Sequence, residues 1–154
     1  MIKKKTWKHL DYNPTTFFDD VAIIKLSKNI TLNEYIQVAC LPIYQSDNYP
    51  STQVDAYTAG WGDTSENGSF TNTLNNVKMY VYPDPEPCEQ IYKSLPKNWR
   101  KQLCSGDVNG GRDSCNDDGG GAVFIKDKIG SKTKYVIAGM NGYGFGCGRP
   151  GIAR

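Results

Sequence analysis

The amino-acid sequence predicts an all-β protein with a Greek-key or barrel-like arrangement of strands. Short segments rich in apolar residues alternate with turns that contain glycine, proline, asparagine or aspartate. One segment alternates between apolar and polar residues, and apolar positions nowhere repeat at helical spacing over three turns. These observations favour strands over helices throughout the 154 residues.

Two segments predict strands by their own apolar patterns. The segment 21–26 is a near-continuous apolar run, typical of a buried barrel strand. In 74–82 apolar residues at every second position predict one inward face, until prolines stop the strand. The other expected elements are a strand at 54–61 closed by Gly60-Trp61-Gly62, a short helix over 88–95, a glycine-rich loop over 106–121 that follows residues 102–105, and strands at 122–126 and 135–140 joined by a turn at 127–131.

Charge and composition exclude several classes of partner. The chain has 18 Lys+Arg against 16 Asp+Glu, with both signs interspersed, so neither a broad basic face for nucleic acid nor an acidic tail is expected. No apolar run approaches the roughly 18 residues of a membrane span. The five cysteines form no CxxC pair, so we expect no metal site and no cofactor.

Cysteine usage indicates an oxidising compartment, so we expect a secreted, extracellular protein. The sequons at 29–31 and 67–69 fit an exported surface. The first ten residues contain a basic stretch but no apolar core of a signal peptide. A signal peptide is therefore expected upstream, in a longer precursor.

Residues 111–122 read Gly-Arg-Asp-Ser-Cys-Asn-Asp-Asp-Gly-Gly-Gly-Ala. This segment resembles the nucleophile loop of the trypsin/chymotrypsin-like serine peptidase family, roughly D-S-C-x-G-D-S-G-G-P. Four more family motifs occur in the family's order: 20–26, Cys40-Leu41-Pro42, 59–62 and 146–152. The resemblance spans almost the whole chain. It implies a chymotrypsin-like double β-barrel whose first barrel is largely missing, with residues 1–45 a remnant of the N-terminal barrel and 46–154 the C-terminal barrel that carries the nucleophile loop and specificity pocket.

Serine peptidases of this family need a serine hydroxyl, a histidine base, an orienting aspartate and N–H donors for the oxyanion. Asp20 matches the orienting aspartate, because it precedes the apolar strand as the family pattern requires. The family's histidine belongs to a T-A-A-H-C motif that is expected before Met1. His9 occupies an H-x-x-Y-N position and is interpreted as a surface residue.

The nucleophile loop departs from the family pattern at the reacting atoms. Gly119 stands where the pattern has serine, and glycine has no side chain with which to attack. Asp117 replaces the glycine whose N–H helps form the oxyanion hole, and Ala122 and Gly142 replace a proline and a supporting serine. Asp118 matches the acid that receives the new amino terminus of an activated relative; without that ammonium it is expected to be solvated or to leave the pocket loop disordered.

The substrate-binding positions match the family better. Asp113 matches the acid at the bottom of a trypsin-like pocket and is followed by Ser114 and Cys115. Gly144 and Gly151 match small wall residues, and Gly142-Tyr143-Gly144 matches the edge that pairs with a peptide, with Tyr143 in place of tryptophan. The resemblance therefore implies a peptide or protein ligand that presents Arg or Lys.

The resemblance also pairs Cys88 with Cys104 and Cys115 with Cys147. It leaves Cys40, whose counterpart in relatives bridges to a chain that precedes the catalytic domain. Ala56 and Ile125 stand where many relatives have a further disulfide.

The expected function is that of a trypsin-like serine peptidase domain, from a family of proteolytic hydrolases, that is non-catalytic in this chain. Two alternatives stay open. The first is a truncated form of an active secreted serine endopeptidase that cleaves after Arg or Lys. The second is a regulatory pseudoprotease module that recruits proteases or recognises basic peptides.

Overall fold

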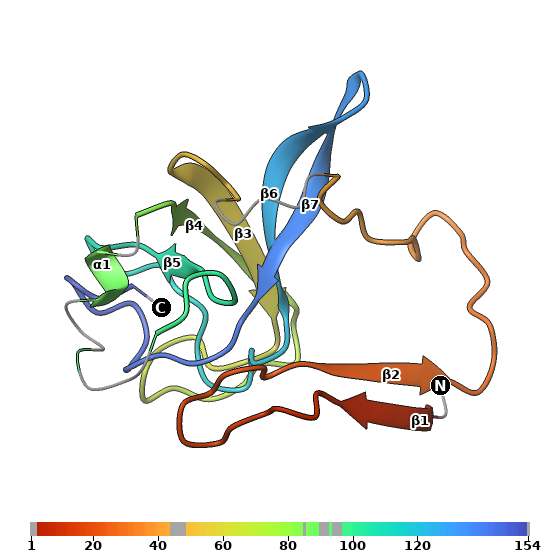
Figure 1. Ribbon diagram of the computed structural model, residues 1–154, viewed down its shortest axis with the longest axis horizontal. Helices are drawn as coiled ribbons and strands as arrows, with labels where there is room; N and C mark the ends of the chain where they lie inside the picture. The colour runs from red at the N-terminus through yellow and green to blue at the C-terminus, as the bar shows by residue number, and fades with distance from the viewer. Residues whose placement is uncertain (1–2, 44–48, 85, 90–92, 94–96, 154) are drawn as a thin grey trace. The chain divides into compact units, whose positions relative to one another are not determined.

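The computed structural model describes residues 3–43, 49–84, 86–89, 93 and 97–153 (Figure 1). The chain divides into two compact units, Met1–Ala39 and Cys40–Arg154. The elements within the described residues are almost all antiparallel strands, which confirms the predicted fold class.

The N-terminal unit contains one antiparallel pair, β1 (Lys3–Lys8) and β2 (Ala22–Leu26). The strand predicted at 21–26 is confirmed by β2, but its predicted burial is wrong, because Ile23 is 66% exposed and Ile24 58%. These neighbours point to opposite faces of a two-stranded ribbon, which cannot bury either face by itself. Strand β1 was not predicted, because its lysine-rich composition shows no apolar alternation.

The C-terminal unit is built on a five-stranded antiparallel sheet in the order β5-β4-β3-β6-β7. Two predicted strands lie within about one residue of their observed bounds, while β5 was not predicted. The helix expected over 88–95 is described only as one turn, and residues 90–92 and 94–96 lie outside the described part. The bounds are β3 Val54–Gly60, β4 Asn75–Tyr82, α1 Glu86–Glu89, β5 Cys104–Gly106, β6 Ala122–Ile129 and β7 Lys132–Met140.

The last hairpin corrects the expected turn at 127–131. Residues Asp127 to Ile129 pair with Lys134 to Lys132, so the turn consists of Gly130 and Ser131 alone. Gly130 has a φ of 63°, in the left-handed region that a two-residue hairpin turn requires. The polar residues before this glycine therefore continue the strand.

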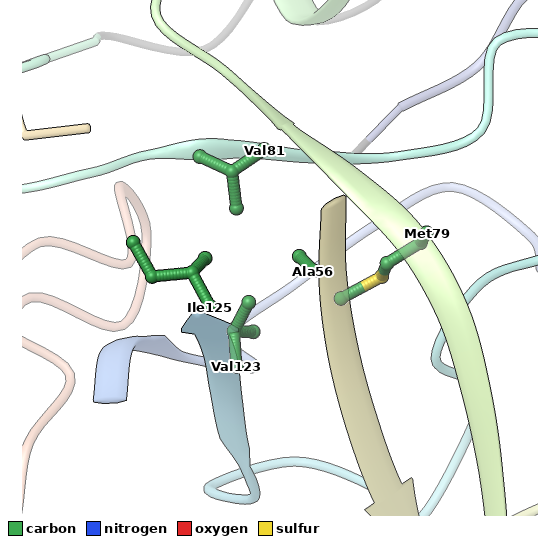
Figure 2. Close-up of a cluster of buried hydrophobic side chains, with 5 residues drawn as sticks. All are labelled: Ala56, Met79, Val81, Val123 and Ile125. Atoms are coloured by element: carbon green, nitrogen blue, oxygen red, sulfur yellow. The ribbon is translucent and has the colours of Figure 1, made fainter. Parts of the chain in front are cut away.

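The core of the sheet consists of side chains at alternating strand positions (Figure 2). Met79 and Val81 come from β4, and Ala56 from β3 meets Val123 and Ile125 from β6. Each of these five residues is at most 2% exposed. The alternation predicted for 74–82 is thus confirmed, and the sheet provides a rigid base for the loops at its ends.

Candidate active site

The loop that carries Gly119 is held against the segment that follows β7. The N–H of Gly120 donates to the carbonyl of Asn141, and the N–H of Asn141 donates to the carbonyl of Gly121, both at 2.8 Å. These two bonds link the two segments directly. Gly119, the predicted nucleophile position, precedes the bonded residues on one segment, and Gly142, where the predicted peptide-binding edge begins, follows Asn141 on the other.

Gly119 is exposed, and its φ lies outside the left-handed region. A Cβ added to Gly119 would meet no atom within 4 Å, and the same is true at Gly142. The backbone here leaves room for a Cβ at both positions. Crowding at the Cβ therefore does not explain why Gly119 is a glycine.

Asp117 is exposed and has a φ of 67°, in the region that favours glycine. The family pattern has glycine at this position, and the structure supplies the backbone reason for it. An aspartate can adopt this conformation, at a cost of about 1 kcal/mol.

We expect Asp117→Gly to raise the free energy of unfolding by about 1 kcal/mol, because it relieves the left-handed conformation. Equilibrium urea unfolding of the variant and the wild type measures the difference. Asp117→Asn is the matched control, since asparagine also tolerates this φ, and it should change stability little. A glycine variant no more stable than the wild type would contradict the prediction.

Asp118 is half-buried and accepts two backbone hydrogen bonds. Its Oδ1 accepts from the N–H of Gly62 and its Oδ2 from the N–H of Cys115, each at 3.0 Å. The expectation of a solvated carboxylate is wrong, because both carboxylate oxygens accept backbone hydrogen bonds. The other expectation, a disordered pocket loop, stays a prediction. A Cβ on Gly60 would lie 1.9 Å from Asp118 Oδ1, which explains physically why the Gly60-Trp61-Gly62 motif needs glycine there.

Asn141 is a positioning residue that the sequence analysis did not identify. Its Nδ2 donates to Thr58 Oγ1 at 2.9 Å and to the carbonyl of Asp118 at 3.3 Å. Thr58 Oγ1 in turn donates to the carbonyl of Ala122 at 3.1 Å. The side chain of Asn141 thus connects strand β3 to both ends of the glycine-rich turn. A single asparagine in a loop gives no sequence signal for this role.

The predicted pocket residues lie where two loops are fastened together. Asp113 Oδ2 accepts from the N–H of Gly148 at 3.1 Å, and the N–H of Gly111 donates to the carbonyl of Gly148 at 2.7 Å. The disulfide Cys115–Cys147, with a Cα–Cα distance of 5.2 Å, joins the same two segments. The loop that carries Asp113 is therefore fixed to the loop that carries the predicted wall residues.

Ser114 and Gly151 differ in their exposure to solvent within these loops. Ser114 is buried at 3% exposure. Gly151 is exposed with a φ of 75°, its N–H donates to the carbonyl of Val108 at 2.7 Å, and an added Cβ would meet nothing within 4 Å. Gly151 therefore faces open space, as a pocket-wall residue must, whereas Ser114 is part of the packing behind the loop.

Tyr143 is turned inward at the predicted peptide edge. Its hydroxyl accepts from Gln102 Nε2 at 2.8 Å, and its ring packs against the cluster formed by the disulfide Cys88–Cys104 and Ala153. Burial raises the pKa of Tyr143 above its ordinary value. Residues 141–144, including Gly144, belong to no strand, so their backbone is not part of the β7 ladder.

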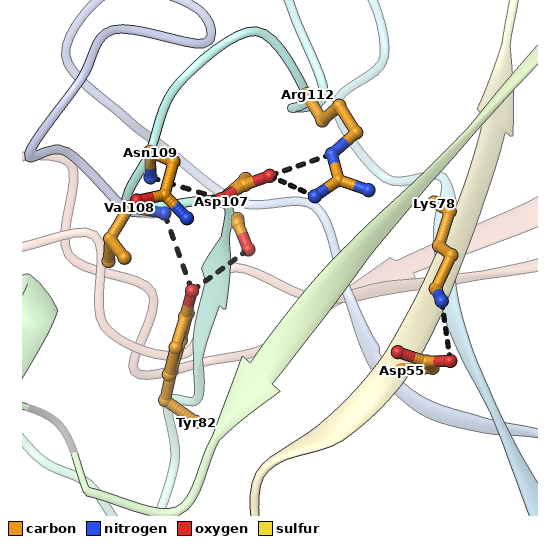
Figure 3. A network of polar contacts seen from close by, with 8 residues as sticks. Asp55, Lys78, Tyr82, Asp107, Val108, Asn109 and Arg112 are labelled. Atoms are coloured by element: carbon orange, nitrogen blue, oxygen red, sulfur yellow. Dashed lines mark hydrogen bonds and ion pairs between the residues drawn. The ribbon is translucent and has the colours of Figure 1, made fainter.

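A polar network fixes the beginning of the glycine-rich loop (Figure 3). Asp107 is 2% exposed, accepts from the N–H of Asn109 at 3.0 Å and forms an ion pair with Arg112, whose Nε lies 2.7 Å from Asp107 Oδ2. The Arg112 guanidinium lies over the ring of Tyr80, 5.5 Å from its centroid. The backbone N–H of Asn109 and the Arg112 guanidinium lower the pKa of Asp107 below its ordinary value of 3.8.

This pKa shift predicts a loss of stability in acid. A carboxylate whose pKa is lowered by folding contributes stability that is fully present above its unfolded pKa and is lost as the pH falls through the folded value. We expect unfolding midpoints in urea to fall as the pH decreases from about 4 toward 2, and the slope to be smaller in Asp107→Asn. An unchanged slope in the variant would contradict the assignment to Asp107.

A second ion pair joins the loop after β3 to the loop after Cys147. Arg149 Nε donates to Glu66 Oε2 at 2.5 Å, and Arg149 Nη2 contacts Glu66 Oε1, so the pair is bidentate. The hydrogen bonds from Arg149 lower the pKa of Glu66. This contact restrains the rim of the same loop cluster.

Asp20 and His9 belong to the N-terminal unit, and both are exposed. Asp20 lies two residues before β2. His9 Nδ1 accepts from the N–H of Asp11 at 3.2 Å, and its backbone N–H donates to the carbonyl of Val21 at 3.0 Å. These contacts fit a surface role for His9.

The remaining expectations concern cysteine, metal and membrane. Cys40 has a free, half-buried thiol, and its carbonyl accepts from the N–H of Ile137 at 2.9 Å. Among the described residues no group of three or more His, Cys, Asp or Glu is arranged to hold a metal ion. No described helix has the length and apolar character needed to cross a membrane.

Comparison with known proteins agrees with these motifs. A family model described as Trypsin matches residues 2–153. The venom protease of Bombus pensylvanicus is 32% identical over 143 residues, which cover 92% of this chain and 56% of that protein. Trypsin eta of Drosophila melanogaster is 31% identical over 92% of this chain and 50% of its own length, and mannan-binding lectin serine protease 1 of Mus musculus is 30% identical over 95% and 20%. The chain thus spans at most 56% of the length of these three relatives.

Proposed function

Because the chain belongs to the trypsin family of serine peptidases, we propose that it binds peptides that present Arg or Lys and does not hydrolyse them. The observation that carries this proposal is Gly119. The position that the family uses for the attacking oxygen is exposed and uncrowded, yet it holds no side chain. Without a nucleophile, a site of this kind retains only the weak effect of its binding groups on the reaction.

Asp117 supports the same conclusion. Its carboxylate occupies the position of the family's oxyanion glycine, on a loop that must tolerate negative charge developing on the substrate. A carboxylate near that charge opposes its stabilisation. Both departures from the family pattern act against hydrolysis and leave the ground-state binding positions in place.

The binding half of the proposal rests on Asp113 and its surroundings. The carboxylate is half-buried and is oriented by the N–H of Gly148, and Gly151 faces open space. A single carboxylate at the position that matches the bottom of a trypsin-like pocket would suit a guanidinium or ammonium group. The disulfide Cys115–Cys147 keeps the two loops in place whether or not a ligand is bound.

Titration calorimetry with benzamidine, a simple aryl cation, tests the binding half. We expect weak binding to the wild type and a loss of at least about tenfold in Asp113→Asn, because one charge-assisted hydrogen-bond partner is removed. The exposed Asp11→Asn is the charge-matched control and should bind as the wild type does. Equal affinities for the wild type and Asp113→Asn would remove the pocket from the proposal.

Hydrolysis of peptide substrates with Arg or Lys at the cleaved bond tests the other half. The wild type is expected to show no turnover above a buffer blank. Any turnover should be unchanged in Asp20→Ala, because a contaminating peptidase does not depend on that residue. Turnover that disappears in Asp20→Ala would instead favour the active endopeptidase.

We further propose a secreted protein, since two disulfides in the C-terminal unit fit an oxidising compartment. Cys40 is proposed as the attachment point of another chain, because its thiol is unpaired in this chain. Binding without cleavage would make the protein a regulatory module that recruits a partner with exposed Arg or Lys side chains.

A further inference from the structure

The hairpin of β6 and β7 is a lysine-rich part of the chain, as is β1 with four lysines. Residues 126–134 contain four lysines and one carboxylate, Asp127, a formal charge of +3. The rest of the chain holds 14 Lys+Arg and 15 Asp+Glu, a formal charge of −1. All four lysines are exposed: Lys126, Lys128, Lys132 and Lys134.

Strand pairing fixes the spacing of these lysines. Lys126 pairs with Tyr135 and Lys128 with Thr133, while Asp127 pairs with Lys134 and Ile129 with Lys132. Because side chains alternate along a strand, Lys126 and Lys128 share one face of the hairpin, and Lys132 and Lys134 share the other. The two lysines on each face are separated by about 7 Å along the strand.

The four lysine side chains of the hairpin tip are accessible to a ligand. β6 pairs with β3 only from Val123 to Ile125, so the residues beyond have β7 as their one neighbouring strand in the described part of the chain. Figure 1 shows the turn of this hairpin extending past the end of β3. The lysines therefore lie on a projecting two-stranded ribbon.

The single carboxylate of the hairpin is held by uncharged groups. Asp127 Oδ2 accepts from the Tyr49 hydroxyl at 2.5 Å, and Asp127 Oδ1 accepts from the N–H of Lys128 at 2.7 Å. Burial and the bond to Asp127 raise the pKa of Tyr49, so the tyrosine stays neutral at physiological pH. Lys126 Nζ lies 5.5 Å from the ring centroid of Tyr135, a contact that leaves its positive charge intact.

The residue types select the class of partner. Residues 126–134 contain no arginine for bidentate phosphate contacts, and the aromatic ring beside them, Tyr135, is already in contact with Lys126 and with the ring of Tyr57. The one large apolar residue within 126–134, Ile129, is half-buried, so these nine residues lack the exposed apolar anchor of a protein interface. Point charges on both faces suit a flexible linear polyanion, and disulfide-bonded chains occur outside the cell, where sulfated polysaccharides are found.

We propose that the β6–β7 hairpin binds a sulfated polysaccharide through Lys126, Lys128, Lys132 and Lys134. This binding site is separate in sequence from the residues of the proposed peptide site and does not depend on whether that site binds or cleaves peptides. It would attach the protein to an anionic extracellular surface.

Surface plasmon resonance on immobilised heparin tests the proposal with the full chain. The dissociation constant should rise at least about tenfold between about 50 and about 200 mM NaCl, because the attraction is screened. Replacing all four hairpin lysines by Gln should weaken binding at about 50 mM NaCl by at least about tenfold. The variant should keep the wild-type thermal midpoint, because exposed lysines carry no core packing.

The matched control replaces the four lysines of β1 by Gln: Lys3, Lys4, Lys5 and Lys8. This variant loses the same net charge. We expect it to keep most of the heparin affinity, because its lysines belong to the other compact unit and the four hairpin lysines stay in place. An equal loss in the β1 variant, or wild-type affinity in the hairpin variant, would overturn the proposal. Competition by polyglutamate that is stronger than competition by soluble heparin would assign the surface to an acidic protein instead, and that outcome would also overturn it.

Discussion

Replacing Ala56 and Ile125 together by cysteine is expected to produce a third disulfide that stabilises the fold by about 4 kcal/mol. The two residues are direct partners in the β3–β6 ladder and are 0% and 2% exposed. Directly opposed residues of antiparallel strands have Cα atoms about 4.5 to 5.5 Å apart, within the range that a disulfide spans. The bridge would close a loop of about 70 residues, and long loops gain the most from cross-linking in the chain-entropy model.

The measurement is urea unfolding without reductant, with the new bond verified by mass spectrometry of a non-reduced digest. Ala56→Cys combined with Ile125→Val is the matched control, since it has a similar core volume and only one of the two sulfurs. The doubly cysteine-substituted protein should be more stable than this control by about 4 kcal/mol. Failure of the bond to form, or equal stability, would contradict the strand register.

Removing the Asp118 carboxylate is expected to cost about 2 to 6 kcal/mol, because two backbone donors lose their acceptor. The N–H groups concerned belong to Gly62 and Cys115, and both residues are buried. Asp118→Ala should therefore show a large fall in the free energy of unfolding. Asp118→Asn, which keeps one carbonyl oxygen, should fall between the alanine variant and the wild type.

Asp117→Asn is the control for this series, because Asp117 is the neighbouring exposed aspartate. It should change stability by less than about 0.5 kcal/mol. Equal effects of Asp117→Asn and Asp118→Asn would mean that the loop does not depend on the two bonds to Asp118. The benzamidine affinity of Asp118→Asn shows in addition whether these bonds also position the loop of Asp113.

Periodicity predicted the strands that have an inward face. The alternation of Val77, Met79 and Val81 was sufficient to identify β4, because burial on one face of a sheet imposes a period of two. β1 could not be predicted in this way, since its residues read Lys-Lys-Lys-Thr-Trp-Lys and 13 residues separate it from its partner strand β2. The prediction that β2 is buried was wrong, because an apolar run shows that a strand could be buried but not whether another element packs against it.

The candidate site could be predicted only where residue type alone decides the chemistry. Gly119 follows from the residue type alone, because a missing side chain is visible in the sequence, and its place in the site stays a prediction. The inward orientation of Tyr143 and the connecting role of Asn141 depend on partners more than 40 residues away, Gln102 and Thr58. Such long-range contacts leave no local pattern.

The claim that this site lacks a nucleophile is tested most directly by a fluorophosphonate probe that reacts with activated serine hydroxyls. The intact protein is incubated with the probe and digested, and the peptide that contains residues 113–126 is examined by mass spectrometry. We predict that this peptide remains unmodified under conditions that label trypsin completely. A covalent adduct on this peptide, lost when Ser114 is replaced by Ala, would contradict the account, because it would reveal a reactive hydroxyl in the glycine-rich loop.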